Sequence, residues 1–238
     1  FFLVVFVLSV VYSNVAFAQD SIVLSITPPL FRLNIERGES WSSSVKVVNS
    51  NQYDMTVYPT VVSFEPEGES GFGRFIPIID SDIKNTDSLA SWIKLGGESV
   101  FVPREQSADI PFTVKVPDNA SPGGHYAAIL VGTKPPVKSG GGAAVGLSCF
   151  VTSLLLVRIG GEVVEAGNIR EFSADKFLYK EPQVSLDLRF ENSGNVHVIP
   201  RGEIVIYNMG GRERGRIQIN KATDFGNGAG LHVTIAKW

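Results

Sequence analysis

The chain contains little of the chemistry on which most catalytic, redox and metal sites depend. It has one cysteine, Cys149, and three histidines in 238 residues. A single cysteine excludes an intrachain disulfide and a zinc site built from several thiolates. The histidines, His125, His197 and His232, lie far apart, and no H-x-H or H-x-x-H pair is present. We therefore expect no catalytic residues, no metal site and no cofactor, and we expect that the protein is not an enzyme.

An excess of charge of either sign is also missing. Lys plus Arg number 21 and Asp plus Glu number 24, for a net charge of -3. Nucleic-acid-binding surfaces are usually strongly basic, so this balance argues against a nucleic-acid partner. No Gly-Lys-Ser/Thr follows the glycine runs at 140–142 and 210–211, which excludes a phosphate-binding loop there. The acidic positions 80, 82 and 87 do not follow the spacing of a calcium-binding loop.

The only long apolar run lies at the start of the chain. Residues 1–12 read FFLVVFVLSVVY and are apolar except for Ser9. An apolar run of about 7–15 residues that ends in A-x-A is typical of a secretory signal peptide, and Ala16-Phe17-Ala18 fits the cleavage site. The run is shorter than the ~20 residues that span a bilayer. We predict a signal peptide at 1–18 and an exported protein, with a retained N-terminal anchor as the alternative.

Sustained helical periodicity is missing too, and alternation of apolar and polar residues takes its place. With 24 Gly and 13 Pro between the alternating segments, the pattern is typical of an all-β fold of antiparallel strands. Residues 65–87, rich in Gly, Asp and Ser, predict a long loop with one short strand, and such loops are often functional. The clearest predicted strands are 43–48, 55–64, 92–95, 108–116, 125–133, 145–159 and 183–190.

A change at Gly160-Gly161 predicts two domains after the signal peptide, at 19–160 and 161–238. An internal repeat supports the division. Residues 45–51 (VKVVNSN) and 188–195 (LRFENSGN) both read as strand, Asn-Ser turn and start of the next strand. Any β-sandwich needs such turns, so the alternative is that the two segments are unrelated. We predict two tandem immunoglobulin-like antiparallel β-sandwiches, the second smaller than the first.

Residues 26–132 carry an ordered set of turn and strand signatures. A Pro-rich opening is followed by Gly38-Glu39, a strand ending in Asn49, a Trp-containing segment, and VPDNASPGGHYAAILVG at 116–132. This order resembles the peptidoglycan-binding domain of bacterial WxL-interacting cell-surface proteins. The resemblance covers about half of the chain. It implies an extracytoplasmic, non-catalytic binding or scaffold protein, at the cell surface or secreted, whose partner is peptidoglycan or a cell-surface protein.

Members of that family usually end in a transmembrane helix, whereas this sequence ends at Trp238, so membrane attachment would require an anchor beyond it. The same residues resemble more loosely the immunoglobulin-like fold of periplasmic pilus chaperones. That likeness implies an alternative function, an assembly module that uses strand pairing. Such a chaperone needs a basic cleft that anchors a carboxylate. Arg32, Lys46 and Lys115 lie on predicted strands, and a basic cleft between the domains would favour this alternative.

Six residues are the candidates for ligand binding. Flat aromatic rings stack on sugars, which nominates Trp41, Phe72, Phe75 and Trp92, although packing in the core or in a loop is the alternative for each. Arg212 and Arg214 belong to a short basic cluster that would contact an anionic polymer. The alternative for these two arginines is a solvated hairpin tip.

Overall fold

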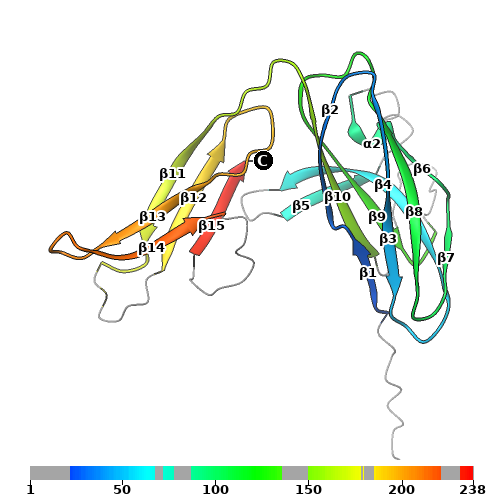
Figure 1. Ribbon diagram of the computed structural model, residues 1–238, viewed down its shortest axis with the longest axis horizontal. Helices are drawn as coiled ribbons and strands as arrows, with labels where there is room; N and C mark the ends of the chain where they lie inside the picture. The colour runs from blue at the N-terminus through cyan, green and yellow to red at the C-terminus, as the bar shows by residue number, and fades with distance from the viewer. Residues whose placement is uncertain are drawn as a thin grey trace, which may run out of the picture.

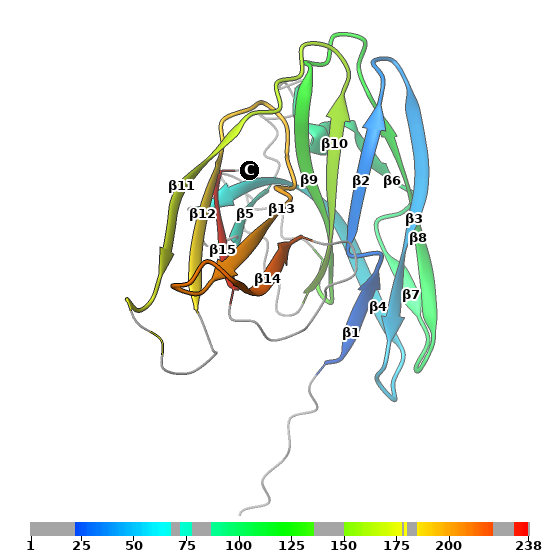
Figure 2. The same ribbon diagram turned by 60° about the vertical axis from the view of Figure 1, so that its left-hand side comes forward.

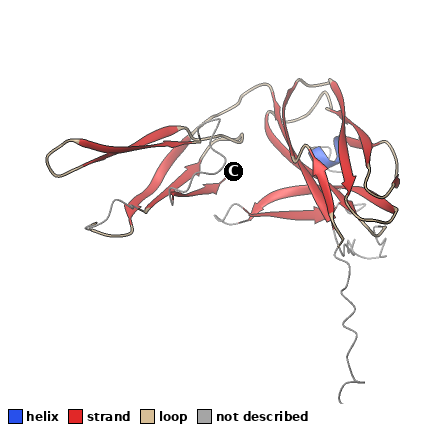
Figure 3. Cartoon of the chain, turned by 60° about the horizontal axis from the view of Figure 1, so that its bottom comes forward, coloured by secondary structure: helices blue, strands red, loops and turns tan. Residues whose placement is uncertain are grey.

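The computed structural model describes residues 22–67, 72–77, 87–135, 150–177, 179, 185–220 and 231–237. Their regular secondary structure is β-strand except for one helical turn, α2 (Leu89–Trp92) (Figure 3). The all-β prediction is confirmed. No helix in the described part of the chain is long and apolar enough to cross a membrane. The predicted signal peptide and Cys149 lie outside the described residues.

The strands from β1 to β10, together called the N-terminal unit, form two sheets that face each other (Figure 1). The first sheet has the order β1-β3-β8-β6, and the second has the order β2-β10-β9-β4-β5, with β7 also paired to β4. The bounds are β1 (Leu24–Thr27), β2 (Leu30–Ile35), β3 (Ser40–Asn49), β4 (Met55–Glu67), β5 (Phe72–Pro77), β6 (Ile93–Leu95), β7 (Val100–Val102), β8 (Ser107–Lys115), β9 (Gly123–Gly132) and β10 (Phe150–Ile159).

Alternation along the strands builds the core between these sheets. On β8, Ile110, Phe112 and Val114 are buried, while the residues between them are more exposed. Val45 and Val47 on β3 face the same interior. The central strand β9 is buried on both faces, because its second face carries Ala128 and Leu130 in a separate small apolar cluster.

The N-terminal unit departs from a purely antiparallel fold at β2. Prolines at 28 and 29 interrupt the first strand, as expected of residues that cannot donate to a ladder, and the chain passes from one sheet to the other between β1 and β2. Strand β2 then pairs with β10 in parallel, from Leu30 beside Leu154 to Ile35 beside Ile159. The other pairings in this unit are antiparallel.

The strands after Gly160, together called the C-terminal unit, form two smaller sheets (Figures 1 and 2). A three-stranded sheet has the order β11-β12-β15, and a two-stranded sheet pairs β13 with β14. The bounds are β11 (Gly167–Ala174), β12 (Leu186–Asn192), β13 (Gly202–Tyr207), β14 (Glu213–Ile219) and β15 (Leu231–Lys237). The two units share no strand. The domain boundary near residue 160 stays a prediction.

Two local predictions need correction or refinement. A strand was expected at 92–95, but residues up to Trp92 form the helical turn α2, and only Ile93–Leu95 is strand. The short Ser-Leu-Ala-Ser-Trp stretch turns here because Ser91 donates to the Ser88 carbonyl. The expected loop at 65–87 begins later than predicted, since β4 runs to Glu67 and β5 is the short strand within it.

Candidate functional site

The structure places the two candidate tryptophans in the core of the N-terminal unit. Trp92 is 5% exposed and its ring lies 4.7 Å from that of His125. Trp41 is half-buried and meets Phe31 and Phe112 edge to face, at centroid distances of 5.6 and 5.8 Å. Packing of this kind stabilises a core and leaves little ring surface for a sugar.

The other four candidates lie in two pairs, Phe72 and Phe75 on β5 and Arg212 and Arg214 at the β13–β14 hairpin. Phe75 on β5 packs against Phe64 and Phe150. The side chain of Phe72 lies outside the described residues. Arg212 and Arg214 are exposed at the β13–β14 hairpin. The structure brings no ligand site together from these six residues, and their role in ligand binding stays a prediction.

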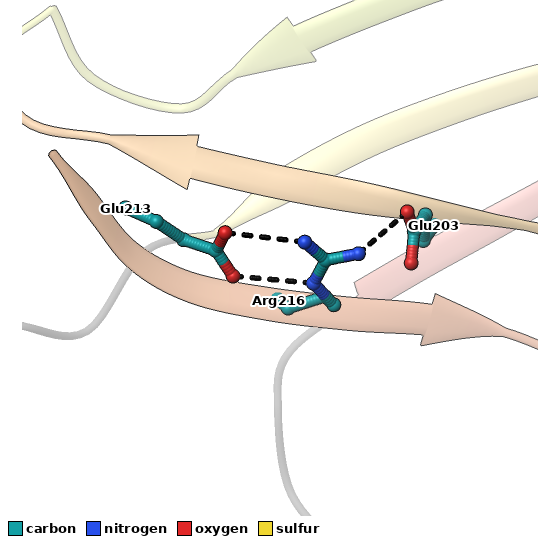
Figure 4. A network of polar contacts seen from close by, with 3 residues as sticks. All are labelled: Glu203, Glu213 and Arg216. Atoms are coloured by element: carbon teal, nitrogen blue, oxygen red, sulfur yellow. Dashed lines mark hydrogen bonds and ion pairs between the residues drawn. The ribbon is translucent and has the colours of Figure 1, made fainter. Parts of the chain in front are cut away.

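Charged side chains of the β13–β14 hairpin form ion pairs with one another. Arg216, the third arginine of the cluster, binds the Glu213 carboxylate through two nitrogens at 3.1 Å and reaches Glu203 on β13 at 2.6 Å (Figure 4). These contacts raise the pKa of Arg216 and lower that of Glu213. Asn208 closes the tip by accepting from the backbone of Gly210 and Arg212. The basic cluster is therefore partly neutralised by the carboxylates of its own hairpin.

One Ser, His and Asp lie together near α2, but not as a catalytic relay. The Ser121 hydroxyl donates to the Asp87 carboxylate at 2.7 Å, and the Ser121 amide donates to the same group at 3.0 Å. The His125 ring nitrogens face the backbone carbonyls of Ser121 and Asp87. Burial acts to raise the pKa of Asp87, but the two hydrogen bonds from Ser121 and the nearby charge of His125 together outweigh it and lower the pKa. Because the hydroxyl does not meet the imidazole, the cluster fixes a turn rather than activating a nucleophile.

A direct junction joins the two units around Asn195. The Asn195 side chain donates to the Glu162 carbonyl and accepts from the Val164 amide, at 2.9 and 2.8 Å. Its own carbonyl accepts from the Gly124 amide of β9 at 2.8 Å. The two glycines that begin β9 permit this approach. A Cβ at Gly123, which has φ of +120°, would lie 2.7 Å from the Asn195 carbonyl oxygen.

Beside this junction the outer face of the second sheet carries two arginines. Arg32 lies on β2 and Arg158 on the adjacent parallel strand β10, where Arg158 is level with Asn34 and Arg32 with Leu156. Side chains alternate along a strand, so both arginines lie on the same face of the sheet. Tyr126 of β9, level with Leu156, shares that face. Glu165, just after the connection between the units, forms an ion pair with Arg158.

His197 of the C-terminal unit packs into this basic surface. Its ring meets Tyr126 edge to face at 5.9 Å. Burial lowers the pKa of His197, the positive charges of Arg32 and Arg158 lower it further, and Glu165 opposes them. Its Nδ1 atom is buried and has no hydrogen-bond partner among the described residues. Arg32 and Arg158, which are 126 positions apart, thus act on one imidazole at the junction.

The three basic residues considered for a cleft in the sequence do not lie together. Arg32 belongs to this junction, whereas Lys46 and Lys115 lie on β3 and β8 in the opposite sheet. Sequence reasoning missed Arg158, Tyr126 and His197. Arg158 could have been singled out in the sequence because it is the single charged residue in the apolar strand segment LLLVRI. Because Glu165 balances one of the two arginines, the cluster keeps one positive charge beside a half-buried imidazole, which favours a bound anionic group, such as a carboxylate, over a neutral ligand.

The C-terminal unit contains a second surface, an apolar groove between its two sheets. The groove has a volume of about 310 Å³. Ile169 and Phe172 of β11 and Leu188 and Phe190 of β12 line one side, and Ile204 of β13 and Ile219 of β14 line the other. Ile169 and Phe172 are 62% and 54% exposed. The two sheets therefore face each other without closing completely over their apolar residues.

Comparisons with known proteins give distant likenesses only. No family model matches the chain, and no curated relative matches it. Among solved structures, a chaperone–tip adhesin complex of CFA/I fimbriae shares 13% identity over 84% of this chain and 83% of that one, with a TM-score of 0.43. The Escherichia coli chaperone DraB shares 14% identity over 84% of this chain and 96% of that one, at 0.37.

A third similar structure is a glycoside hydrolase of family 123 from Clostridium perfringens, with 13% identity over 58% of this chain and 27% of that one, and a TM-score of 0.39. Pilus chaperones are thus among the similar structures, as the looser of the two resemblances predicted. At these identities and TM-scores the comparisons carry no argument about function. Peptidoglycan binding stays a prediction.

Proposed function

We propose that the protein is an exported, non-catalytic assembly module that holds an extended segment of a protein partner by strand pairing and anchors a carboxylate of that partner. The observation that carries the proposal is the placement of Arg32 and Arg158 on one face of adjacent strands, beside the junction of the two units. A basic surface between the units is the feature expected of the chaperone-like alternative and not of a purely structural sandwich.

Strand β2 supplies the edge that strand pairing needs. It is the terminal strand of its sheet and pairs only with β10 among the described strands. An extended peptide that adds to an open edge gains main-chain hydrogen bonds, and its side chains fill alternate positions. A peptide on β2 would lie alongside Arg32, and its terminal carboxylate would meet the charges of Arg32 and Arg158.

Two arginines suit this role better than two lysines would. A guanidinium presents a planar fork of donors that matches the two oxygens of a carboxylate. Arg158 already pairs with the Glu165 carboxylate through its Nη1 atom, and Arg32 has no ion pair in the part of the chain that the structure describes. A second carboxylate would therefore approach from the Arg32 side.

The test compares two probes of the same sequence, a short peptide of alternating Val and Thr with a free C-terminal carboxylate and its C-terminal amide. We expect the purified chain to bind the free acid at least about tenfold more tightly, since a charge-assisted contact of about 1.5 kcal/mol corresponds to that ratio. Arg32→Ala removes the preference, and Lys115→Ala on the opposite sheet is the matched control. Equal binding of acid and amide overturns the proposal.

The same purified chain is pelleted with purified peptidoglycan in a parallel experiment. Saturable pelleting that Arg32→Ala leaves unchanged, together with equal binding of the two peptides, would favour the cell-wall partner implied by the first resemblance. Preference for the free acid without pelleting supports the protein partner.

A further inference from the structure

Strand β11 is an open edge with an unusual exposure of apolar side chains. It pairs with β12 alone among the described strands, and all eight of its residues are exposed. Within it, Ile169-Arg170-Glu171-Phe172 places two charges of opposite sign between two large apolar residues. Ile169 and Phe172 are the parts of the apolar groove that solvent reaches most directly.

A β-bulge sorts these four residues onto two faces. In a regular strand, residues three apart point to opposite faces. Here the register with β12 shifts between Ile169, which lies beside Phe190, and Glu171, which lies beside Arg189, so that Arg170 is the extra residue. Ile169 and Phe172 therefore share the groove face with Phe190. Both charges lie on the outer face, where Arg170 pairs with Glu191 and Glu171 lies 4.0 Å from Arg189.

We propose that β11 is a self-association strand, and that it pairs antiparallel with β11 of a second copy of this chain. With the two-fold axis between Arg170 and Glu171, each Arg170 lies opposite the partner's Glu171. Each Ile169 then lies opposite the partner's Phe172. The order apolar, positive, negative, apolar is self-complementary under this rotation. Opposite charges and apolar residues that face each other across antiparallel strands are the pairs that stabilise a sheet.

The charge order is what selects a second copy as the occupant. An edge that avoids pairing commonly carries proline, a charge that points toward the sheet interior, or a bulge that twists the edge away. Strand β11 has the bulge at Arg170, but it has no proline and its charges lie on the outer face. If both residues carried charges of the same sign, the two copies would repel each other. With one charge of each sign, two opposite-charge pairs form, one on each side of the two-fold axis. The pairing would also join the apolar grooves of the two copies along one continuous face and cover Ile169 and Phe172.

The test measures the mass of the purified chain in solution by sedimentation equilibrium over a range of concentrations. We expect a monomer–dimer equilibrium. Glu171→Arg sets arginine against arginine at both symmetric pairs and weakens the dimer by about tenfold or more. The double variant Arg170→Glu with Glu171→Arg restores opposite charges in the reversed order and recovers the dimer. Arg212→Glu, on the distant hairpin, is the matched control.

A cross-link distinguishes this register from other self-association. In a Cys149→Ser background, Asn168→Cys with Ser173→Cys places each new thiol opposite its counterpart in the second copy. Oxidation then gives a covalent dimer, whereas Asn168→Cys alone does not. Circular dichroism verifies that each variant folds. A chain that stays monomeric at all concentrations, or a dimer that the charge reversal leaves unchanged, overturns the proposal. Neither outcome affects the peptide test at Arg32.

Discussion

Asn49 and Asn192 make the same pair of hydrogen bonds in the two units. Asn49 donates from Nδ2 to the carbonyl of Tyr53 at 2.9 Å, and Asn192 donates to the carbonyl of Val196 at 2.8 Å, four residues ahead in both cases. The Oδ1 atom of each accepts, at 3.0 Å, from the amide two residues ahead. Both side chains are fully buried. The strand-turn repeat seen in the sequence thus has one structural cause, a buried asparagine that closes the turn.

Removal of either asparagine should destabilise its own unit. Asn49→Ala also frees the carbonyls of Val102 and Pro103, which Asn49 reaches at 3.2 and 3.1 Å. Unsatisfied buried groups cost about 1–3 kcal/mol each, so we expect a loss of about 3 kcal/mol for Asn49→Ala and about 2 kcal/mol for Asn192→Ala. Urea unfolding provides the measurement, with the exposed Asn34→Ala as control.

The same experiment tests the domain prediction. If the units unfold separately, Asn49→Ala moves one urea transition and Asn192→Ala moves the other. A single transition that both variants move equally would contradict two independent domains.

The junction between the units should be sensitive to a single methyl group. Gly123→Ala adds a Cβ at a φ of +120° and 2.7 Å from the Asn195 carbonyl oxygen. We expect the contact between Gly124 and Asn195 to break and the connection near residue 161 to become more accessible to protease. Gly202→Ala, where a Cβ meets nothing within 4 Å, is the control. Equal cleavage rates for the two variants would show that the junction does not need the glycine.

The stability of the folded chain should fall in mild acid because of His197. Burial and the charges of Arg32 and Arg158 lower its pKa in the folded state from the ordinary value of 6.5, although Glu165 partly opposes them, and Tyr126 covers the ring. The unfolded state then binds the proton more readily. The stabilisation is complete above the unfolded pKa and is lost as pH falls through the lowered folded pKa. Urea midpoints from neutral to mildly acidic pH measure this loss, and His197→Gln should reduce the slope.

Trp92 should act as a core residue. Its indole is buried beside His125, so Trp92→Ala removes a large core side chain and should cost about 3–5 kcal/mol. Thermal or urea unfolding measures the loss. A variant that keeps its stability but loses retention on purified glycan would instead support the sugar-binding prediction for this residue.

Local pattern was enough to predict much of the fold. Alternation in 108–116 predicted that Ile110, Phe112 and Val114 share one face, and the Asn-Ser turns placed two strand ends within two residues of those observed at Asn49 and Asn192. Composition likewise predicted an all-β chain. These features depend on neighbours in the sequence, and local periodicity reports them directly.

The candidate site depended on contacts that local pattern does not contain. Arg32 and Arg158 lie on adjacent strands only because β2 leaves the first sheet at Pro28-Pro29 and pairs in parallel with β10. The candidate aromatic residues were chosen because their rings can stack on sugars. Whether such a ring is buried depends instead on the position and face that it occupies in the fold, which residue type does not reveal. The bulge at Arg170, which places Ile169 and Phe172 on one face, likewise appears only in the register with β12.

The most direct test of the proposed anchor is the titration of the His197 imidazole by NMR, with and without the free-acid peptide. A carboxylate bound by Arg32 and Arg158 offsets the two positive charges that lower the His197 pKa. The account predicts that the free acid raises this pKa and that the amide does not. A His197 pKa that neither peptide changes, at concentrations where the free acid is bound, would contradict a carboxylate anchor at the junction.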